Sequence, residues 1–224
     1  MLKDALPWFK DTIENELNSA NDNPIIDGIG EHVLHGGHFY GGHIAMVMDS
    51  MKAAVANLAD LHDRQMALLL DTKMNHDLPS NLSAAEGERK AINHGFKAVQ
   101  IGCSAWTAEA LKLTMPASVF SRSTECHNQD KVSMGTIAAR DCMRVLELTE
   151  QVTVATLLAS YQGSVLRERM AGELRETGLE LAEMRASLAA EFELLVEDRP
   201  LEHELRGWLD KIRSKPWNLY GESA

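Results

Sequence analysis

The chain has 224 residues and a mass of 24.8 kDa, enough for one large domain or two small ones. Its formal net charge of −11 disfavours nucleic acid as a partner, because phosphate binding needs clustered Lys and Arg. Three scattered cysteines, none in C-x-x-C spacing, indicate reduced thiols. The charged N-terminus is unlike a signal peptide, and no apolar window is long enough to span a bilayer. We therefore expect a cytoplasmic protein without a membrane partner.

The hydrophobic periodicity predicts an all-α chain. A first amphipathic helix covers residues 2–19, and the connector at 24–34 favours a small hairpin around Asp27 and Gly28. Long helices follow at 42–71, 86–114 and 132–161. The helix at 42–71 has an apolar stripe formed by Ile44, Met48, Met51, Val55, Leu58 and Leu61. No segment has a strong strand pattern.

The composition changes after Gly163, where Glu, Arg and Leu become frequent. We therefore divide the chain into a helical-bundle part at 1–163 and a charged C-terminal helical segment at 164–224. The first stretch of this segment predicts an exposed helix or a helix pair broken near Gly178. Asp198 and Pro200 predict the start of a short last helix, with Asp198 at the N-cap.

A glycine-rich loop, HGGHFYGGH at 35–43, precedes the long helix at 42–71. Such a loop at a helix N-terminus offers free backbone N–H groups, and Phe39 and Tyr40 could form aromatic walls of a site. Four histidines at 32, 35, 38 and 43 could ligate zinc. No Cys, Asp or Glu completes a standard ligand spacing, so we interpret them as loop hydrogen-bonding residues and expect no metal.

A polar loop at 116–131 separates two of the long helices, and loops of this kind are often functional. Its amides Asn128 and Gln129 suit the carboxylate and amine of a zwitterion, although helix capping explains them equally well. Asp130 is expected to cap the helix that follows. Three serines at 118, 121 and 123 lie near His127, but no glycine elbow surrounds them, so a serine hydrolase is disfavoured.

Five motifs together resemble the aromatic amino acid ammonia-lyase family. They are SANDNP at 19–24, GGHFYG at 36–41, AWTAEA at 105–110, MPASV at 115–119 and HNQDKVSMG at 127–135. The resemblance covers about residues 1–165 and is most similar to bacterial tyrosine ammonia-lyases. It implies a long antiparallel helix bundle, a tetrameric assembly and a 4-methylideneimidazol-5-one (MIO) electrophile formed from an Ala-Ser-Gly tripeptide. In that chemistry the electrophile captures the substrate's amine, a tyrosine removes a proton, and ammonia leaves.

The chain departs from the family because it contains no Ala-Ser-Gly, and the family's catalytic tyrosine and arginine lie upstream of the first motif. We therefore expect the C-terminal half only, inactive without a separate N-terminal half. The resemblance implies that Phe39 packs beside the electrophile, as a catalytic and cofactor-binding residue. It implies that Asn128 and Gln129 bind substrate, with Gln129 also catalytic. His38 replaces the family's usual asparagine, as in the bacterial tyrosine branch.

The expected activity is the deamination of L-tyrosine or L-phenylalanine to the trans-arylacrylate, because Asn-Gln-Asp at 128–130 differs from the Gln-Glu-Asp typical of histidine ammonia-lyases. The alternatives left open are half of a histidine ammonia-lyase or an aminomutase, and a truncated helical oligomerisation protein without catalysis.

Overall fold

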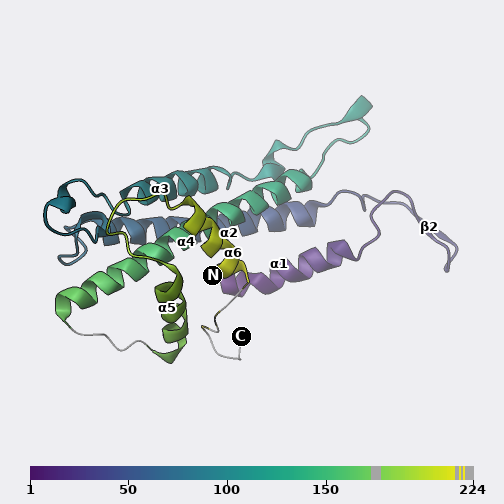
Figure 1. Cartoon of the computed structure of the whole chain (residues 1–224). Helices are drawn as coiled ribbons and strands as arrows, with labels where there is room; N and C mark the ends of the chain where they lie inside the picture. The colour runs from purple at the N-terminus through teal and green to yellow at the C-terminus, as the bar shows by residue number, and fades with distance from the viewer. Residues whose placement is uncertain (173–177, 215–216, 218, 220–224) are drawn as a thin grey trace. The chain divides into compact units, whose positions relative to one another are not determined.

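The computed structural model describes residues 1–172, 178–214, 217 and 219, and these are mostly helical. The expected all-α class is confirmed (Figure 1). The α-helices of the described residues are α1 (Leu2–Leu17), α2 (Gly42–Leu70), α3 (Lys97–Lys112), α4 (Gly135–Ala171), α5 (Leu179–Glu191) and α6 (Glu202–Arg213). Short 3-10 turns lie at Ser80–Leu82, Gly87–Ala91, Ala117–Phe120 and Glu125–His127. None of these helices is long and apolar enough to cross a membrane.

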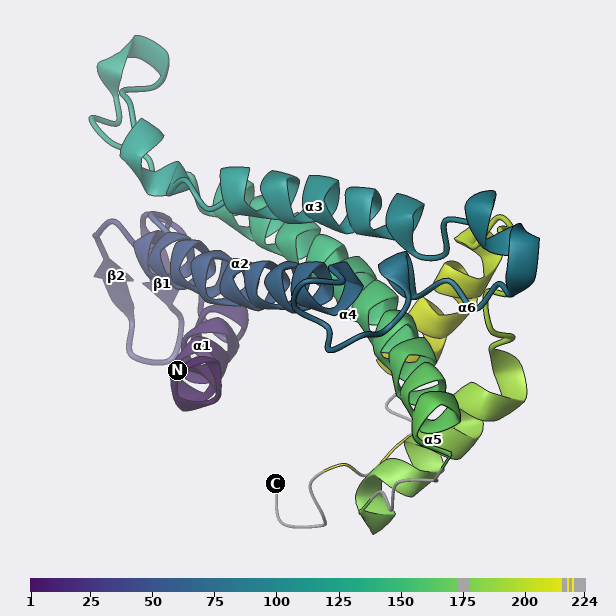
Figure 2. The same cartoon turned by 90° about the vertical axis from the view of Figure 1, so that its left-hand side faces the viewer.

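The chain folds into two compact units, each built from two separate stretches of sequence. The first unit contains Met1–Leu58 and Glu109–Glu147, and the second contains Ala59–Ala108 and Leu148–Ala224. Helices α2, α3 and α4, which are labelled in Figure 2, each contribute residues to both units. The division predicted at residue 163 rests on a change of composition, whereas these units rest on contacts in space. The predicted division is therefore not tested by them and stays a prediction.

The hairpin expected near Asp27 is confirmed. Strand β1 (Ile25–Asp27) pairs antiparallel with β2 (His32–Leu34), and Ile26 lies opposite Val33. The Asp27 carboxylate accepts hydrogen bonds from the backbone N–H groups of Ile29 and Gly30, each at 3.0 Å. This side-chain turn closes the hairpin, as is typical of aspartate.

The expected bounds of α2 are confirmed to within one residue, but the side of the helix that is buried is not the one that carries its apolar stripe. Of that stripe only Val55 is buried, whereas Leu58 and Leu61 are 37% and 51% exposed. The buried side instead includes Ala45, Asp49, Lys52, Ala56, Ala59, Asp63 and Met66. Alanines and a charged pair carry little hydrophobic signal, so periodicity selected the side with the larger apolar residues.

The helix expected at 86–114 begins eleven residues later than predicted, at Lys97. Gly87 and Gly95 have positive φ angles of 54° and 52°, which interrupt a helix. At Gly95 a Cβ atom would lie 2.6 Å from the Asn81 carbonyl oxygen, so the two backbone segments approach too closely for a side chain. The segment before α3 therefore forms a tight loop, and Ile92 is 57% exposed.

The expectation that Asp198 caps the last helix is also wrong, because α6 begins at Glu202 after an N-cap Leu201. The Asp198 carboxylate instead accepts hydrogen bonds from the N–H groups of His94, at 2.8 Å, and Gly95, at 2.9 Å. Burial alone would raise the pKa of Asp198, but these bonds lower it overall. Asp198 therefore stabilises the turn that leads into α3.

Helix α4 continues ten residues beyond its predicted end, through Gly163 to Ala171. A Cβ atom on Gly163 would lie only 3.3 Å from Leu69 Cδ1, so this glycine permits close packing rather than ending the helix. The fully buried Gln162 next to it donates to the Leu82 carbonyl and accepts from the Leu195 N–H. Helix α5 starts directly after Gly178, near the predicted break, whereas the stretch up to Ala171 belongs to α4 and residues 173–177 of the predicted segment lie outside the described residues.

Candidate functional site

In the first unit, one depression brings together residues that are far apart in the sequence. It has a volume of about 540 Å³ and lies between the end of α1, the glycine-rich loop, residues 129–134 and the start of α4. Phe39 and Gln129 both line it, together with Glu16, Tyr40 and Lys131. The fold thus places two of the three predicted site residues in one hollow.

The glycine-rich loop holds two aromatic rings at this depression. The Tyr40 N–H donates to the Gly37 carbonyl at 2.9 Å, which closes a turn around the aromatic pair. A Cβ atom on Gly42 would lie 2.4 Å from Tyr40 Cε1, so the absence of a side chain at this position lets the ring lie against the start of α2. Phe39 and Tyr40 remain 44% and 37% exposed, and their rings are available to a ligand.

The polar loop brings Gln129 to the same hollow but leaves Asn128 outside it. A short 3-10 turn precedes both residues and contains Cys126 and His127 at positive φ. The Gln129 carbonyl accepts a hydrogen bond from the Thr124 N–H at 3.1 Å, and the residue is partly buried. Asn128 is exposed and is not among the lining residues, so its role stays a prediction.

A buried ion pair that the sequence reasoning missed anchors the start of the polar loop to α2. Lys52 Nζ lies 2.9 Å from Asp49 Oδ1 and 2.8 Å from the carbonyl oxygen of Met115. The Asp49 carboxylate also accepts from the N–H groups of Ala117 and Ser118, at 2.9 and 3.2 Å, and from the Ser118 hydroxyl at 2.9 Å. Lys52 therefore binds the first residues of the polar loop through a backbone carbonyl, and Asp49 binds them through backbone N–H groups and a hydroxyl.

Electrostatics explain why Asp49 stays ionised in this environment. Burial on its own would raise its pKa, but Lys52 and the donors at Ala117 and Ser118 lower it below the usual value. A signal for this pair was present in the sequence, as an acid and a base three residues apart on the side that carries Ala45, Ala56 and Ala59.

Residues 1–190 match the family model of the aromatic amino acid lyases. The chain belongs to that family. A tyrosine ammonia-lyase of Cereibacter sphaeroides is 36% identical over 205 residues, which are 90% of this chain and 38% of the relative. A tyrosine 2,3-aminomutase of Chondromyces crocatus is 36% identical over 182 residues, 80% of this chain and 34% of that protein.

A solved structure supports the same fold assignment. The crystal structure of histidine ammonia-lyase from Trypanosoma cruzi superposes with a TM-score of 0.84 at 27% identity, over 95% of this chain and 41% of that one. The family resemblance is thus confirmed. It was expected to end near residue 165, and the family match continues to residue 190. This lyase-family chain spans less than half the length of these relatives.

The local geometry contradicts one capping prediction and describes the surroundings of two other groups, while the expectation of no metal stays a prediction. Asp130 does not cap α4, since the helix begins at Gly135, whose N–H donates to Ser133 Oγ at 3.2 Å. Ser123 Oγ lies 3.0 Å from His127 Nδ1, and no carboxylate among the described residues bonds to this imidazole. Within residues 1–172, 178–214, 217 and 219, no three His, Cys, Asp or Glu side chains gather closely enough to hold a metal.

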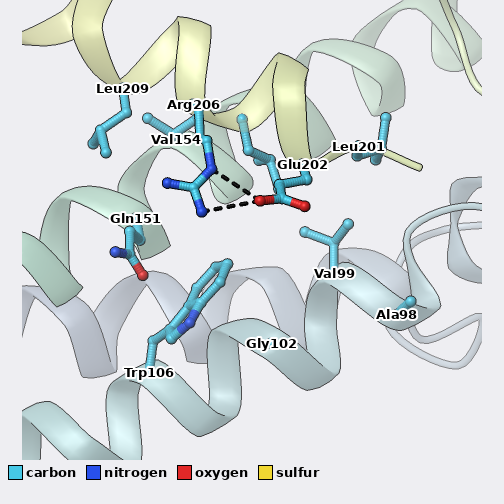
Figure 3. Close-up of a pocket in the computed structure, with 11 residues that line it drawn as sticks. Ala98, Val99, Gly102, Trp106, Gln151, Val154, Leu201, Glu202, Arg206 and Leu209 are labelled. Carbon is cyan, nitrogen blue, oxygen red and sulfur yellow. Dashed lines mark hydrogen bonds and ion pairs between the residues drawn. The ribbon is translucent and has the colours of Figure 1, made fainter.

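A second hollow, of about 420 Å³, lies in the second unit between α3, α4 and α6 (Figure 3). Trp106 of α3 projects toward Arg206 of α6, which forms an exposed ion pair with Glu202 at 2.9 Å. No residue predicted for the site lines this hollow. Helix α6 also lies beyond residue 190, where the family match ends. We therefore assign the candidate site to the depression around Phe39 and Gln129.

Proposed function

We propose that this chain is the C-terminal part of an ammonia-lyase that converts L-tyrosine or L-phenylalanine into the trans-arylacrylate and ammonia. The observation that carries the proposal is the meeting of Phe39 and Gln129 in one depression. An aromatic ring and an amide are the groups that an aromatic amino acid needs for ring contact and for hydrogen bonding. The likeness to a tyrosine ammonia-lyase over 90% of the chain supports this substrate class.

The sequence contains no Ala-Ser-Gly, so the proposal assigns the MIO electrophile to an N-terminal part on another polypeptide. The residues present fit such a group, because the exposed Phe39 ring offers an apolar face and Gln129 offers an amide in the same depression. When bound, MIO would supply the electrophile that takes up the substrate's amine. This chain would contribute one wall of a site in a tetrameric assembly.

Within that wall each residue has a separate task. Phe39 excludes water and limits how the electrophile and the aryl ring can lie. Gln129 hydrogen-bonds the polar end of the substrate, and Asn128 assists it once the other polypeptide closes the site. The Asp49–Lys52 pair positions the loop that carries both amides.

The test is to co-express this chain with the polypeptide encoded immediately upstream and to follow cinnamate or coumarate by absorbance. We expect co-purification and product formation, at a rate that Phe39→Leu and Gln129→Ala lower by at least tenfold, which corresponds to the loss of about 1.4 kcal/mol of transition-state stabilisation. Leu181→Ala, an exposed position on α5, is the matched control. Failure of both co-purification and product formation would contradict the proposal.

Two alternatives remain testable in the same preparation. A β-amino acid product would indicate an aminomutase, and urocanate from L-histidine would indicate a histidine ammonia-lyase. A non-catalytic helical oligomerisation protein is favoured by the exposed apolar residues Met46, Leu61 and Leu68 on α2. That function predicts a defined oligomer of the chain alone in size-exclusion chromatography, with no product in any combination.

A further inference from the structure

The hollow between α3, α4 and α6 in the second unit combines an apolar wall with a few polar groups. It has a volume of about 420 Å³, and the buried residues Val99, Val154 and Leu201 form much of its apolar lining. Pockets of this size between packed helices, with a small number of polar groups, are typical sites for small molecules. None of the residues that line this hollow lines the depression around Phe39 and Gln129, so it is a separate candidate site.

Trp106 offers a flat aromatic surface to this hollow. Its outer ring atoms lie next to Gly102, one turn earlier on α3, where a Cβ atom would be 3.5 Å from Trp106 Cη2. The indole is only partly buried, and its N–H donates no hydrogen bond to any residue that the structure describes. A planar ring system would therefore find a stacking partner here.

The polar groups of the hollow include both donors and acceptors. Arg206 points into it from α6, and Gln151 points into it from α4 (Figure 3). Arg206 contacts Glu202 through Nε and Nη2, at 3.0 and 2.9 Å, and both contacts end on Glu202 Oε1. Within the described part of the chain, Glu202 Oε2, Arg206 Nη1 and the Gln151 amide have no hydrogen-bond partner. A ligand could therefore donate to the carboxylate and accept from the guanidinium and the amide.

The charges around the hollow favour a neutral ligand. Among the described residues that line it, Arg206 and Glu202 carry the formal charges, and these offset each other. An anionic ligand would lie beside the Glu202 carboxylate, and a cationic ligand would lie beside the Arg206 guanidinium. An ion of either sign would therefore meet repulsion as well as attraction. A neutral ring with N–H and carbonyl groups on its edge meets no such conflict.

We propose that this hollow binds a neutral, planar heteroaromatic molecule of the purine class. The ring lies against Trp106, a ring N–H donates to Glu202 Oε2, and ring carbonyl oxygens accept from Arg206 and Gln151. The binding is non-covalent and takes place within the second unit. It goes beyond the proposed lyase function and does not depend on it.

Three soluble two-ring probes separate stacking, hydrogen bonding and charge. Theophylline is neutral and carries one ring N–H and two carbonyl groups. Caffeine has a methyl group in place of that N–H, and 2-naphthoate is an anion without ring donors. Dissociation constants are measured by equilibrium dialysis with the full chain. The variants are Trp106→Leu and Glu202→Ala, and the matched controls at exposed positions outside the hollow are Trp8→Leu and Glu183→Ala.

Theophylline should bind roughly tenfold more tightly than caffeine, because the methyl group removes the donor to Glu202, and it should also bind more tightly than 2-naphthoate. Trp106→Leu should weaken theophylline and caffeine binding by a similar factor of about ten, since both probes lose the stacking surface. Glu202→Ala should weaken theophylline binding and leave caffeine binding nearly unchanged, so that the two probes bind about equally. The two control variants should bind all three probes like the unmodified chain.

Absence of theophylline binding would overturn the inference, and so would tighter binding of 2-naphthoate than of theophylline. The same conclusion would follow if Trp106→Leu bound theophylline normally, or if Glu202→Ala kept the preference for theophylline over caffeine. Because the Glu202 side chain is 67% exposed, this second variant tests the inference even if Trp106→Leu fails to fold.

A fourth probe, 3-phenylpropionate, carries one ring and a carboxylate and reports on the depression around Phe39 and Gln129. Its binding should not change in Glu202→Ala, and a parallel loss of 3-phenylpropionate and theophylline binding would contradict a separate site. The outcome is distinct from that of the lyase assay, because the theophylline measurements use this chain alone. Failure to obtain lyase product would contradict only the proposed function.

Discussion

Lys52 is completely buried one turn along α2 from Asp49, and its ammonium nitrogen lies 2.9 Å from the Asp49 carboxylate. Replacing one partner of such a pair leaves a buried charge without compensation. We expect Lys52→Met to lower the free energy of unfolding by about 3 kcal/mol, measured by urea denaturation. Lys3→Met, at an exposed position on α1, should change it by less than about 0.5 kcal/mol.

The same substitution should loosen the entrance of the polar loop, since Lys52 also bonds the Met115 carbonyl. Arg122 and Lys131, both exposed, are trypsin sites in this loop. Faster cleavage at these two positions in Lys52→Met than in Lys3→Met would support the anchoring role. Equal cleavage rates would contradict it, even if the stability change were observed.

Gly95 should not tolerate a side chain. Its φ of +52° is unfavourable for other residues, and a Cβ atom would lie 2.6 Å from the Asn81 carbonyl and 2.9 Å from the Ser83 nitrogen. We expect Gly95→Ala to destabilise the chain by more than about 1 kcal/mol in thermal or urea unfolding. Gly207→Ala, inside α6 with open space around it, should instead stabilise by about 0.5–1 kcal/mol.

The Arg89–Glu197 ion pair should contribute a pH-dependent stability. The hydrogen bond from Arg89, with that from Asn93, lowers the pKa of Glu197 from 4.5 to about 2. Because the folded-state pKa is depressed, the stabilisation is present above pH 4.5 and is lost as the pH falls toward 2. The difference in thermal midpoint between the unmodified chain and Glu197→Gln should therefore shrink over this interval. A constant difference would contradict the prediction.

The three thiols should differ in reactivity. Burial, aided by the charge of Asp63, raises the pKa of the Cys103 thiol to about 12, and burial also raises that of Cys142. Cys126 is exposed. A thiol reagent at pH 8 should label one cysteine in the folded chain and three after denaturation. Cys126→Ser should abolish the labelling of the folded chain. Fast labelling that persists in this variant would show that the reagent reacts with a buried cysteine, which would contradict the prediction.

Gly42 offers a test of how the aromatic wall is formed. A Cβ atom there would overlap the Tyr40 ring, which can move aside by rotation about its side-chain bonds. We expect Gly42→Ala to change stability little and to weaken 3-phenylpropionate binding, since the displaced ring leaves the depression. Tyr40→Ala should weaken binding to the same extent, and adding Gly42→Ala to it should have no further effect. Independent effects of the two substitutions would contradict this coupling.

The sequence by itself determined the all-α class, the bounds of α1 and α2, the hairpin and the family. These follow from local periodicity, turn chemistry and motifs, which are written within short stretches of the chain. The roles of Phe39, Asn128 and Gln129 come from the family resemblance and stay predictions, and the fold places Phe39 and Gln129 in one depression. Local signals failed at Gly95 and Gly163, where the role of a glycine depends on a backbone or side chain far away in the sequence.

Only the tertiary structure decided which side of α2 is buried and which charges meet. The spacing of Asp49 and Lys52 allows an ion pair on one helix, but only the fold buries this pair and brings the Met115 carbonyl to it. No sequence pattern singles out Glu16, which the fold places in the depression with Gln129 and Lys131. The physical reason is that burial and electrostatic pairing are properties of three-dimensional neighbours, whereas composition and spacing report only neighbours along the chain.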